Sequence, residues 1–151
     1  MAEVNSAQAA LIAAKNKIPH CDHGKVERIV ITTPATFAQL AIADTMATGQ
    51  FIPKGSRILG VWKGHGTGTA SSTFDLGLRK RDGTVIDADG LVAVSALTTA
   101  TTVDVACGTG ALVAAGVDYV TADDAEVYLT AQGAVLAANQ DVRITVEYIG
   151  P

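Results

Sequence analysis

The stretch STFDLGLRK, residues 72–80, decides the fold class because its side chains alternate strictly between two kinds. Successive side chains of an extended strand point to opposite faces, so a period of two predicts a strand with two different faces. Phe74, Leu76 and Leu78 share one face, and residues 73, 75, 77 and 79 share the other. We therefore expect a β-strand that buries the three large apolar side chains.

The same alternation recurs on both sides of this stretch. KVERIVITT (25–33) separates residues 26, 28, 30 and 32 from residues 27, 29 and 31, and DVRITVEYIG (141–150) groups Val142, Ile144, Val146 and Tyr148. SRILGVWKG (56–64) and AEVYLTAQ (125–132) are also strand-like, and turn signals such as PKG, RDG and AANQD lie between the segments. Residues 89–97 fit either a strand or a short helix. Many short strands joined by turns predict an all-β, antiparallel sandwich or barrel.

The first 18 residues differ from the remainder of the chain. They contain helix formers behind a possible cap at Asn5 or Ser6, but their large apolar residues are only Leu11 and Ile12. A helix of about ten residues is marginal in water without packing. We expect residues 1–18 to form an N-terminal arm that becomes ordered against a partner through Leu11 and Ile12, and residues 19–151 to form the β domain.

Composition limits the classes of partner. Of the 151 residues 48% are hydrophobic and only 17% are charged, which is below the roughly 25% usual in soluble domains. Either other subunits cover part of the surface, or the protein is a compact, alanine-rich monomer. The net charge is −4, and the only basic cluster, residues 79–81, is typical of a polar hairpin tip. The acidic balance and the lack of a larger basic patch make nucleic acid an unexpected partner. A membrane is not expected either, since the longest apolar runs fall short of the roughly 18 residues that a span needs.

The glycine-rich sequence GHGTG (64–68) is a weak candidate for phosphate binding. A phosphate loop works because its backbone N–H groups converge at the start of a helix. Here the following residues alternate as a strand, and no Gly-Lys-Ser/Thr ending is present. We interpret the stretch as a hairpin connection between two strands.

The second candidate site, PHCDHGK (19–25), holds potential metal ligands in His20, Cys21, Asp22 and His23. Neighbouring side chains in extended backbone point in opposite directions, so a site would need His20 and Asp22 together with His65 or Cys107 from elsewhere. A second ligand pair at a typical spacing is missing, which favours a solvated turn. The two cysteines, Cys21 and Cys107, fit reduced thiols in a protein made in the cytosol.

Other polar pairs also have simple interpretations. Asp87/Asp89 and Asp123/Asp124 lie in turn-like sequences and do not repeat a calcium-loop pattern. The three histidines lie in polar or glycine-rich segments, without a recognisable nucleophile and orienting group. The sequence therefore predicts no enzyme, no cofactor and no metal.

Three segments of the chain carry a resemblance: NSAQAALIAAKNKIP at the start, DTMATGQFIPKGSRILGV leading to TFDLGL in the centre, and GAVLAANQDVRITVEYI at the end. In these segments the sequence resembles the capsid decoration or cement proteins of tailed bacteriophages. The positions that carry the resemblance are Asp44, Met46, Ile52, Pro53, Gly55, Arg57 and Ile58, then Thr73 to Gly77, and then Val142 to Tyr148.

This resemblance implies a jelly-roll-like β-sandwich that forms a homotrimer on the outer capsid surface of the virion. It implies binding to the major capsid protein lattice, stabilisation of the head, and no catalytic residues. The alternative hypothesis is a fibre, spike or host-recognition module that binds carbohydrate, for which the chain offers few aromatic residues.

Overall fold

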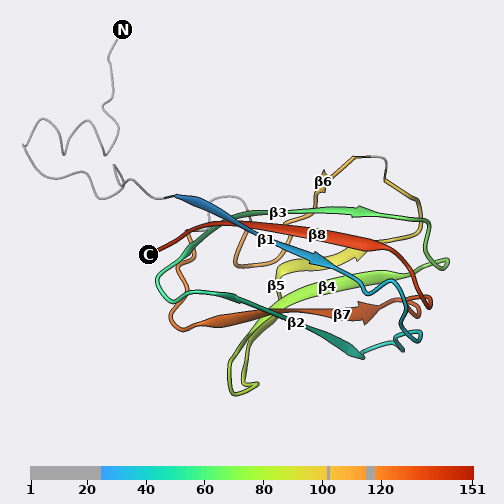
Figure 1. The fold of residues 1–151 in the computed structure, drawn as a ribbon, viewed down its shortest axis with the longest axis horizontal. Helices are drawn as coiled ribbons and strands as arrows, with labels where there is room; N and C mark the ends of the chain where they lie inside the picture. The colour runs from blue at the N-terminus through green and yellow to red at the C-terminus, as the bar shows by residue number, and fades with distance from the viewer. Residues whose placement is uncertain (1–24, 102, 115–117) are drawn as a thin grey trace, which may run out of the picture.

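The computed structural model describes residues 25–101, 103–114 and 118–151, and these form an all-β fold (Figure 1). The strands are β1 (Val26–Thr32), β2 (Thr45–Ile52), β3 (Arg57–His65), β4 (Thr73–Lys80), β5 (Val85–Ala96), β6 (Val105–Ala106), β7 (Ala125–Gln132) and β8 (Val142–Ile149). The predicted all-β class is confirmed. No helix among the described residues is long and apolar enough to cross a bilayer. The arm, its boundary at residue 18, and Leu11 and Ile12 lie outside the described residues.

The strands form two four-stranded sheets, in the orders β1-β8-β3-β6 and β2-β7-β4-β5. Each of the first four strands pairs antiparallel with one of the last four: β1 with β8, β2 with β7, β3 with β6, and β4 with β5. This is the pattern of one long hairpin rolled into a sandwich, which is a jelly roll. The predicted antiparallel, jelly-roll-like sandwich is confirmed.

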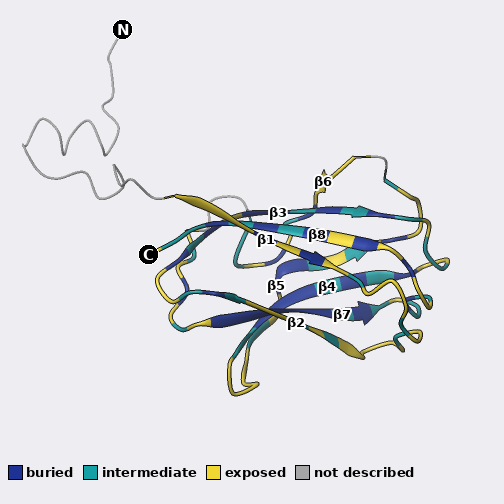
Figure 2. Ribbon diagram, viewed as in Figure 1, coloured by how far each residue is buried: buried dark blue, intermediate teal, exposed yellow. Residues whose placement is uncertain are grey.

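The core lies between the inner faces of the two sheets (Figure 2). Phe74, Leu76 and Leu78 of β4 are fully buried, as their alternation predicted. The same pattern is confirmed in β1, where Ile29 and Ile31 are buried, and in β8, whose buried residues are Val142, Ile144, Val146 and Tyr148. Because the hydrophobic effect scales with apolar area removed from water, these strands supply much of the stability of the fold.

Two tight turns follow their sequences. In the β2–β3 turn the Ser56 N–H donates to the Pro53 carbonyl at 3.2 Å, and Gly55 has a φ of +85°, which glycine adopts without steric cost. In the β4–β5 turn the Gly83 N–H donates to the Lys80 carbonyl at 2.9 Å. The interpretation of residues 79–81 as part of a hairpin tip is confirmed.

Two local predictions were wrong. The GHGTG stretch does not link neighbouring strands of a hairpin, because β3 and β4 belong to different sheets and residues 66–72 pass from one sheet to the other. Asp87 and Asp89 do not lie in a turn but within β5, which runs through the ambiguous segment 89–97. The pairing of β5 with β4 shifts register three times, and these irregularities break the alternation that identifies a strand.

Candidate functional site

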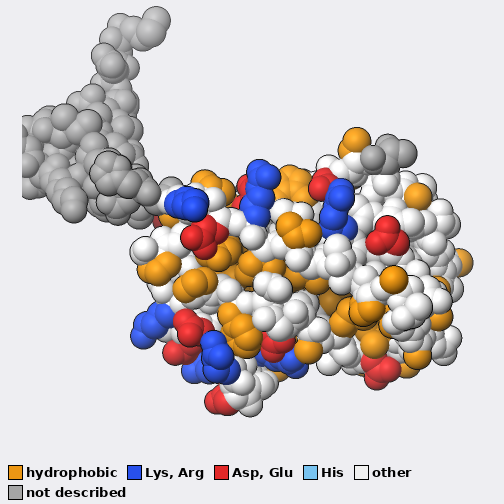
Figure 3. Space-filling model, viewed as in Figure 1, with side chains coloured by type: hydrophobic (Ala, Val, Ile, Leu, Met, Phe, Trp, Pro, Cys, Tyr) orange, Lys and Arg blue, Asp and Glu red, His pale blue; other side chains and the backbone are white. Residues whose placement is uncertain are grey.

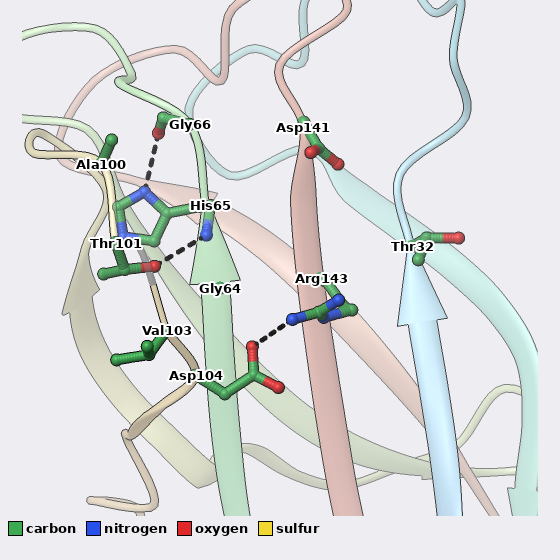
Figure 4. Close-up of a pocket in the computed structure, with 10 residues that line it drawn as sticks. All are labelled: Thr32, Gly64, His65, Gly66, Ala100, Thr101, Val103, Asp104, Asp141 and Arg143. Carbon is green, nitrogen blue, oxygen red and sulfur yellow. Dashed lines mark hydrogen bonds and ion pairs between the residues drawn. The ribbon is translucent and has the colours of Figure 1, made fainter.

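A polar pocket of about 460 Å³ opens beside the end of β3 (Figure 4). Its most polar wall is the ion pair between Arg143 of β8 and Asp104, whose Nη2 and Oδ1 atoms are 2.6 Å apart. This hydrogen bond and the charge of Asp104 raise the pKa of Arg143 above its ordinary value. Gly64 makes the approach possible, because a Cβ atom there would lie 2.6 Å from Asp104 Oδ1.

His65 lines the same pocket, but its ring and its main-chain N–H are both engaged by neighbouring residues. Its Nδ1 lies 2.8 Å from the Gly66 carbonyl oxygen, and its main-chain N–H donates to Thr101 Oγ1 at 3.0 Å. General-base catalysis by histidine needs a nucleophile in hydrogen-bond reach and a group that orients the ring. Asp104 is engaged by Arg143 rather than by the ring, as Figure 4 shows. The residues that line the pocket are therefore polar, but they do not place a nucleophile, a base and an orienting group in hydrogen-bond contact with one another.

Lys63 and Cys107 form the second chemically interesting pair, inside the sandwich. The Lys63 ammonium donates a hydrogen bond to the Ala96 carbonyl and lies 5.9 Å from the centre of the Phe74 ring. Burial lowers the pKa of Lys63 and raises the pKa of the Cys107 thiol to about 11. Since the thiolate is the reactive form of cysteine, Cys107 is a protonated, unreactive thiol at neutral pH.

The outer face of the β1-β8-β3 sheet combines exposed apolar side chains with ion pairs. Val26 and Val30 of β1 are 50% and 53% exposed. Between them Arg28 Nε lies 2.5 Å from Glu147 Oε1 on β8. On β3 the indole of Trp62 lies over Gly60, where a Cβ atom would come within 2.8 Å of the ring. Hydrophobic patches between charged groups are visible in Figure 3.

The basic residues of the β4–β5 hairpin are paired rather than free. Arg79 Nε lies 2.7 Å from Glu126 Oε2, and Lys80 Nζ lies 2.8 Å from Asp123 Oδ2. Arg81 stacks on Phe51, with 4.5 Å between the guanidinium carbon and the ring centre. A phosphate backbone is bound by lysine and arginine groups that can neutralise it, and two of these three cations, Arg79 and Lys80, already have carboxylate partners.

The predicted site residues have separate outcomes. His20, Cys21, Asp22 and His23 lie outside the described residues, as do Leu11 and Ile12 of the predicted arm. Within residues 25–101, 103–114 and 118–151 no group of three or more metal-ligating side chains comes together. Asp124 lies just ahead of β7, in the turn-like sequence that was predicted there, and its Oδ1 accepts the Lys54 N–H at 3.0 Å.

Sequence reasoning missed the pocket and the apolar outer face. The Arg143–Asp104 pair joins residues 39 positions apart, and nothing in the local sequence links them. Alternation did separate Val26 and Val30 from Ile29 and Ile31. It did not show which of the two faces packs against the second sheet and which remains exposed.

No family model and no curated protein matches this sequence. Among the solved structures that match the fold, two cover most of this chain with a TM-score above 0.5. A chain in the capsid of Ralstonia phage GP4 has a TM-score of 0.63 and 16% identity, over 89% of this chain and 90% of that one. A chain in the cyanophage Pam1 capsid asymmetric unit has a TM-score of 0.57 and 22% identity, over 100% of both chains. The protein shares its jelly-roll fold with chains of two phage capsids.

Proposed function

We propose that this protein is a structural component of a tailed-bacteriophage virion that decorates and stabilises the head. In this proposal it forms a homotrimer on the outer capsid surface and binds the lattice of the major capsid protein. It is made in the host cytoplasm, and it acts by binding rather than by catalysis.

The observation that carries the proposal is the length of the match to the cyanophage Pam1 chain, which covers 100% of both chains. A chain of this size and fold thus occurs as a separate polypeptide in that capsid asymmetric unit. The same fold hosts unrelated functions in other proteins, so the fold alone is only an analogy. The motifs that resemble decoration proteins narrow the role.

The surface chemistry supports a binding role. Apolar side chains separated by satisfied ion pairs, such as Arg28–Glu147 and Arg143–Asp104, are typical of polar protein–protein contacts. The pocket lacks a catalytic set around His65, and the Cys107 thiol is buried and protonated. These features suit a protein that contributes contact area to an assembly.

We place the capsid contact in the arm, at Leu11 and Ile12. These two residues form the only pair of large apolar side chains in residues 5–17, among alanine, lysine and small polar residues. A segment that becomes ordered on binding must recover its conformational entropy from the contacts that it forms. Leu11 and Ile12 are the side chains able to supply that energy.

The test is co-sedimentation with phage heads that lack the protein. We expect the intact chain to pellet with the heads, and the Leu11→Ala/Ile12→Ala double variant to bind at least tenfold more weakly. Ala9→Ser/Ala10→Ser is the matched control, because it changes neighbouring small residues and keeps both large side chains. Equal binding by all three proteins would remove the arm from the proposal, and no binding by the intact chain would refute the decoration role.

Carbohydrate recognition has less support. Sugar-binding modules present aromatic rings on an exposed face, whereas the exposed large hydrophobic residues in the described part of the chain are all valine, leucine or isoleucine. Tyr128 and Tyr148 are buried, and Trp62 lies over Gly60.

A further inference from the structure

The two sheets of the sandwich end in four edge strands: β1 and β6 in one sheet, β2 and β5 in the other. An edge strand presents unpaired backbone N–H and C=O groups and can recruit a strand from another molecule. Natural proteins therefore block their edges with short strands, bulges, charges or covering loops. Whether each edge is blocked indicates where this protein can pair.

Three of the four edges are blocked. β6 has only two residues, and β2 contains a bulge between Ala47 and Phe51 with Gly49 at a φ of 66°. β5 shifts register three times against β4, and a following loop covers it through hydrogen bonds from the Gly110 and Leu112 N–H groups to β5 carbonyls. None of these strands offers a straight, free edge of useful length.

β1 is the exception. It pairs with β8 in one continuous register from Val26 to Thr32, without a bulge. The Thr33 N–H donates to the Val142 carbonyl at 3.0 Å, which identifies Thr33 and every second residue before it as bonded to β8. The backbone groups of Arg28, Val30 and Thr32 therefore point to the other side. Within the described part of the chain, no backbone group pairs with them there.

The sequence of β1 is complementary to itself in the antiparallel direction. Ile29-Val30-Ile31 reads the same both ways, so a second β1 with Val30 opposite Val30 sets Ile29 against Ile31. In that register Arg28 lies opposite Thr32, and no two like charges meet. Registers that place Arg28 opposite Arg28, or Glu27 opposite Glu27, bring like charges together and are disfavoured. Charge thus selects the register centred on Val30.

We propose that β1 is a docking edge for β1 of a second copy of this chain. The two strands pair antiparallel about a two-fold axis through Val30, and they join two four-stranded sheets into one continuous sheet. An antiparallel pair of identical strands is two-fold by construction, so this contact uses one surface on both molecules. It does not depend on binding to a capsid, and it differs from a three-fold contact, so it would link two trimers.

Cysteine cross-linking tests the register directly. Residues of a hydrogen-bonded antiparallel pair have Cα atoms about 5.5 Å apart, within the range of a disulfide. In a Cys21→Ser background, with Cys107 buried, Val30→Cys should form a disulfide-linked dimer under mild oxidation. Val26→Cys is the control, since it is equally exposed but would lie roughly 27 Å from its counterpart in this register, at 3.4 Å per residue. Equal cross-linking of both variants would overturn the proposal.

A charge exchange tests the contact without covalent chemistry. Val30→Lys and Val30→Glu each place like charges opposite each other, and because the Val30 side chain is half exposed, both variants should keep the native circular dichroism. We expect each variant alone to have half the native mass of the unmodified protein by light scattering. A mixture of the two variants should recover the full mass. A native mass that is the same for the unmodified chain, each variant and the mixture would overturn the proposal.

Discussion

At the scale of single residues, Val94 is the one β-branched residue with a positive φ in the described part of the chain. It lies within β5 with a φ of 51°, a conformation that costs most residues roughly 1–2 kcal/mol and is rare for a β-branched side chain. Asp75 of β4 holds it there, since its Oδ1 accepts the Val94 N–H at 2.7 Å. The Val94 side chain is 68% exposed, so little packing compensates for the strain.

Replacing Val94 by glycine should therefore stabilise the protein. We expect Val94→Gly to raise the free energy of unfolding by about 1 kcal/mol in urea titrations, because glycine adopts positive φ freely. Val85→Gly is the control in the same strand, where an exposed valine has an ordinary φ and glycine should cost about 0.5–1 kcal/mol. A loss of stability in both variants would mean that Val94 is not strained.

Glu126 links a single residue to the pH dependence of stability. A hydrogen bond from Arg79 is the main cause that lowers the pKa of Glu126 from its ordinary value of 4.5, against the opposing effect of burial. Because the folded pKa is depressed, the ionised pair stabilises the fold above about pH 4.5, and this contribution is lost as the pH falls through the lower folded pKa.

Glu126→Gln should remove this part of the acid sensitivity. We expect the urea midpoint of the variant to fall less between pH 5 and pH 3 than that of the unmodified protein. Asp123→Asn is the matched control: Asp123 also pairs with a cation, Lys80, but the pair is exposed to solvent and contributes little. The idea fails if the two variants show the same change in pH dependence.

At the scale of elements, the strand faces were predictable and the connections were not. In β1, β4 and β8 one face is buried, so apolar residues occur at every second position and the face can be read from the sequence. β5 could not be recognised with the same certainty because its bulges move successive side chains out of the period of two. The path of residues 66–72 depends on the partners of β3 and β4, which lie elsewhere in the chain.

The glycines of this connection have unequal roles. A Cβ atom at Gly68 would lie 2.4 Å from Gln140 Nε2 and 2.7 Å from the Leu97 carbonyl oxygen, whereas a Cβ atom at Gly66 would meet nothing within 4 Å. We expect Gly68→Ala to reduce the free energy of unfolding by about 1–3 kcal/mol through overpacking, and Gly66→Ala to leave it nearly unchanged. Thermal or urea unfolding measures both, and equal effects would contradict the close packing around Gly68.

At the scale of the whole molecule, the pairing of distant strands was beyond local sequence. The sequence of each strand predicts which of its side chains are buried, but the sequence of β1 does not identify β8 as its neighbour. The resemblance to phage decoration proteins did imply the jelly roll, because a resemblance implies a complete topology. The pocket and the β1 edge, which is unpaired within the described part of the chain, depend on that topology, and no residue pattern predicted them.

The mass of the oligomer tests the predicted homotrimer separately from the β1–β1 contact. If Val30→Lys removes the β1 contact, the oligomer that remains reports the predicted homotrimer. We expect Val30→Lys to have three times the 15.4 kDa mass of one chain in light scattering across a range of concentrations. A mass of one chain would refute the trimer while leaving the β1 cross-linking result intact.

The pairing of β1 with β8 also affects how the protein is synthesised. Arg28 and its partner Glu147 are 119 residues apart, so a ribosome adding 5–20 residues per second needs roughly 6–24 s to make the second after the first. β1 thus leaves the ribosome before its partner strand β8 has been made, and until β8 follows it β1 lacks its native neighbour. β3 also lacks its β8 neighbour during this time, because β8 lies between β1 and β3 in their sheet. Nascent chains on one messenger therefore carry β1 strands without their β8 partners at the same time, and a self-complementary β1 would allow such chains to pair before they are complete.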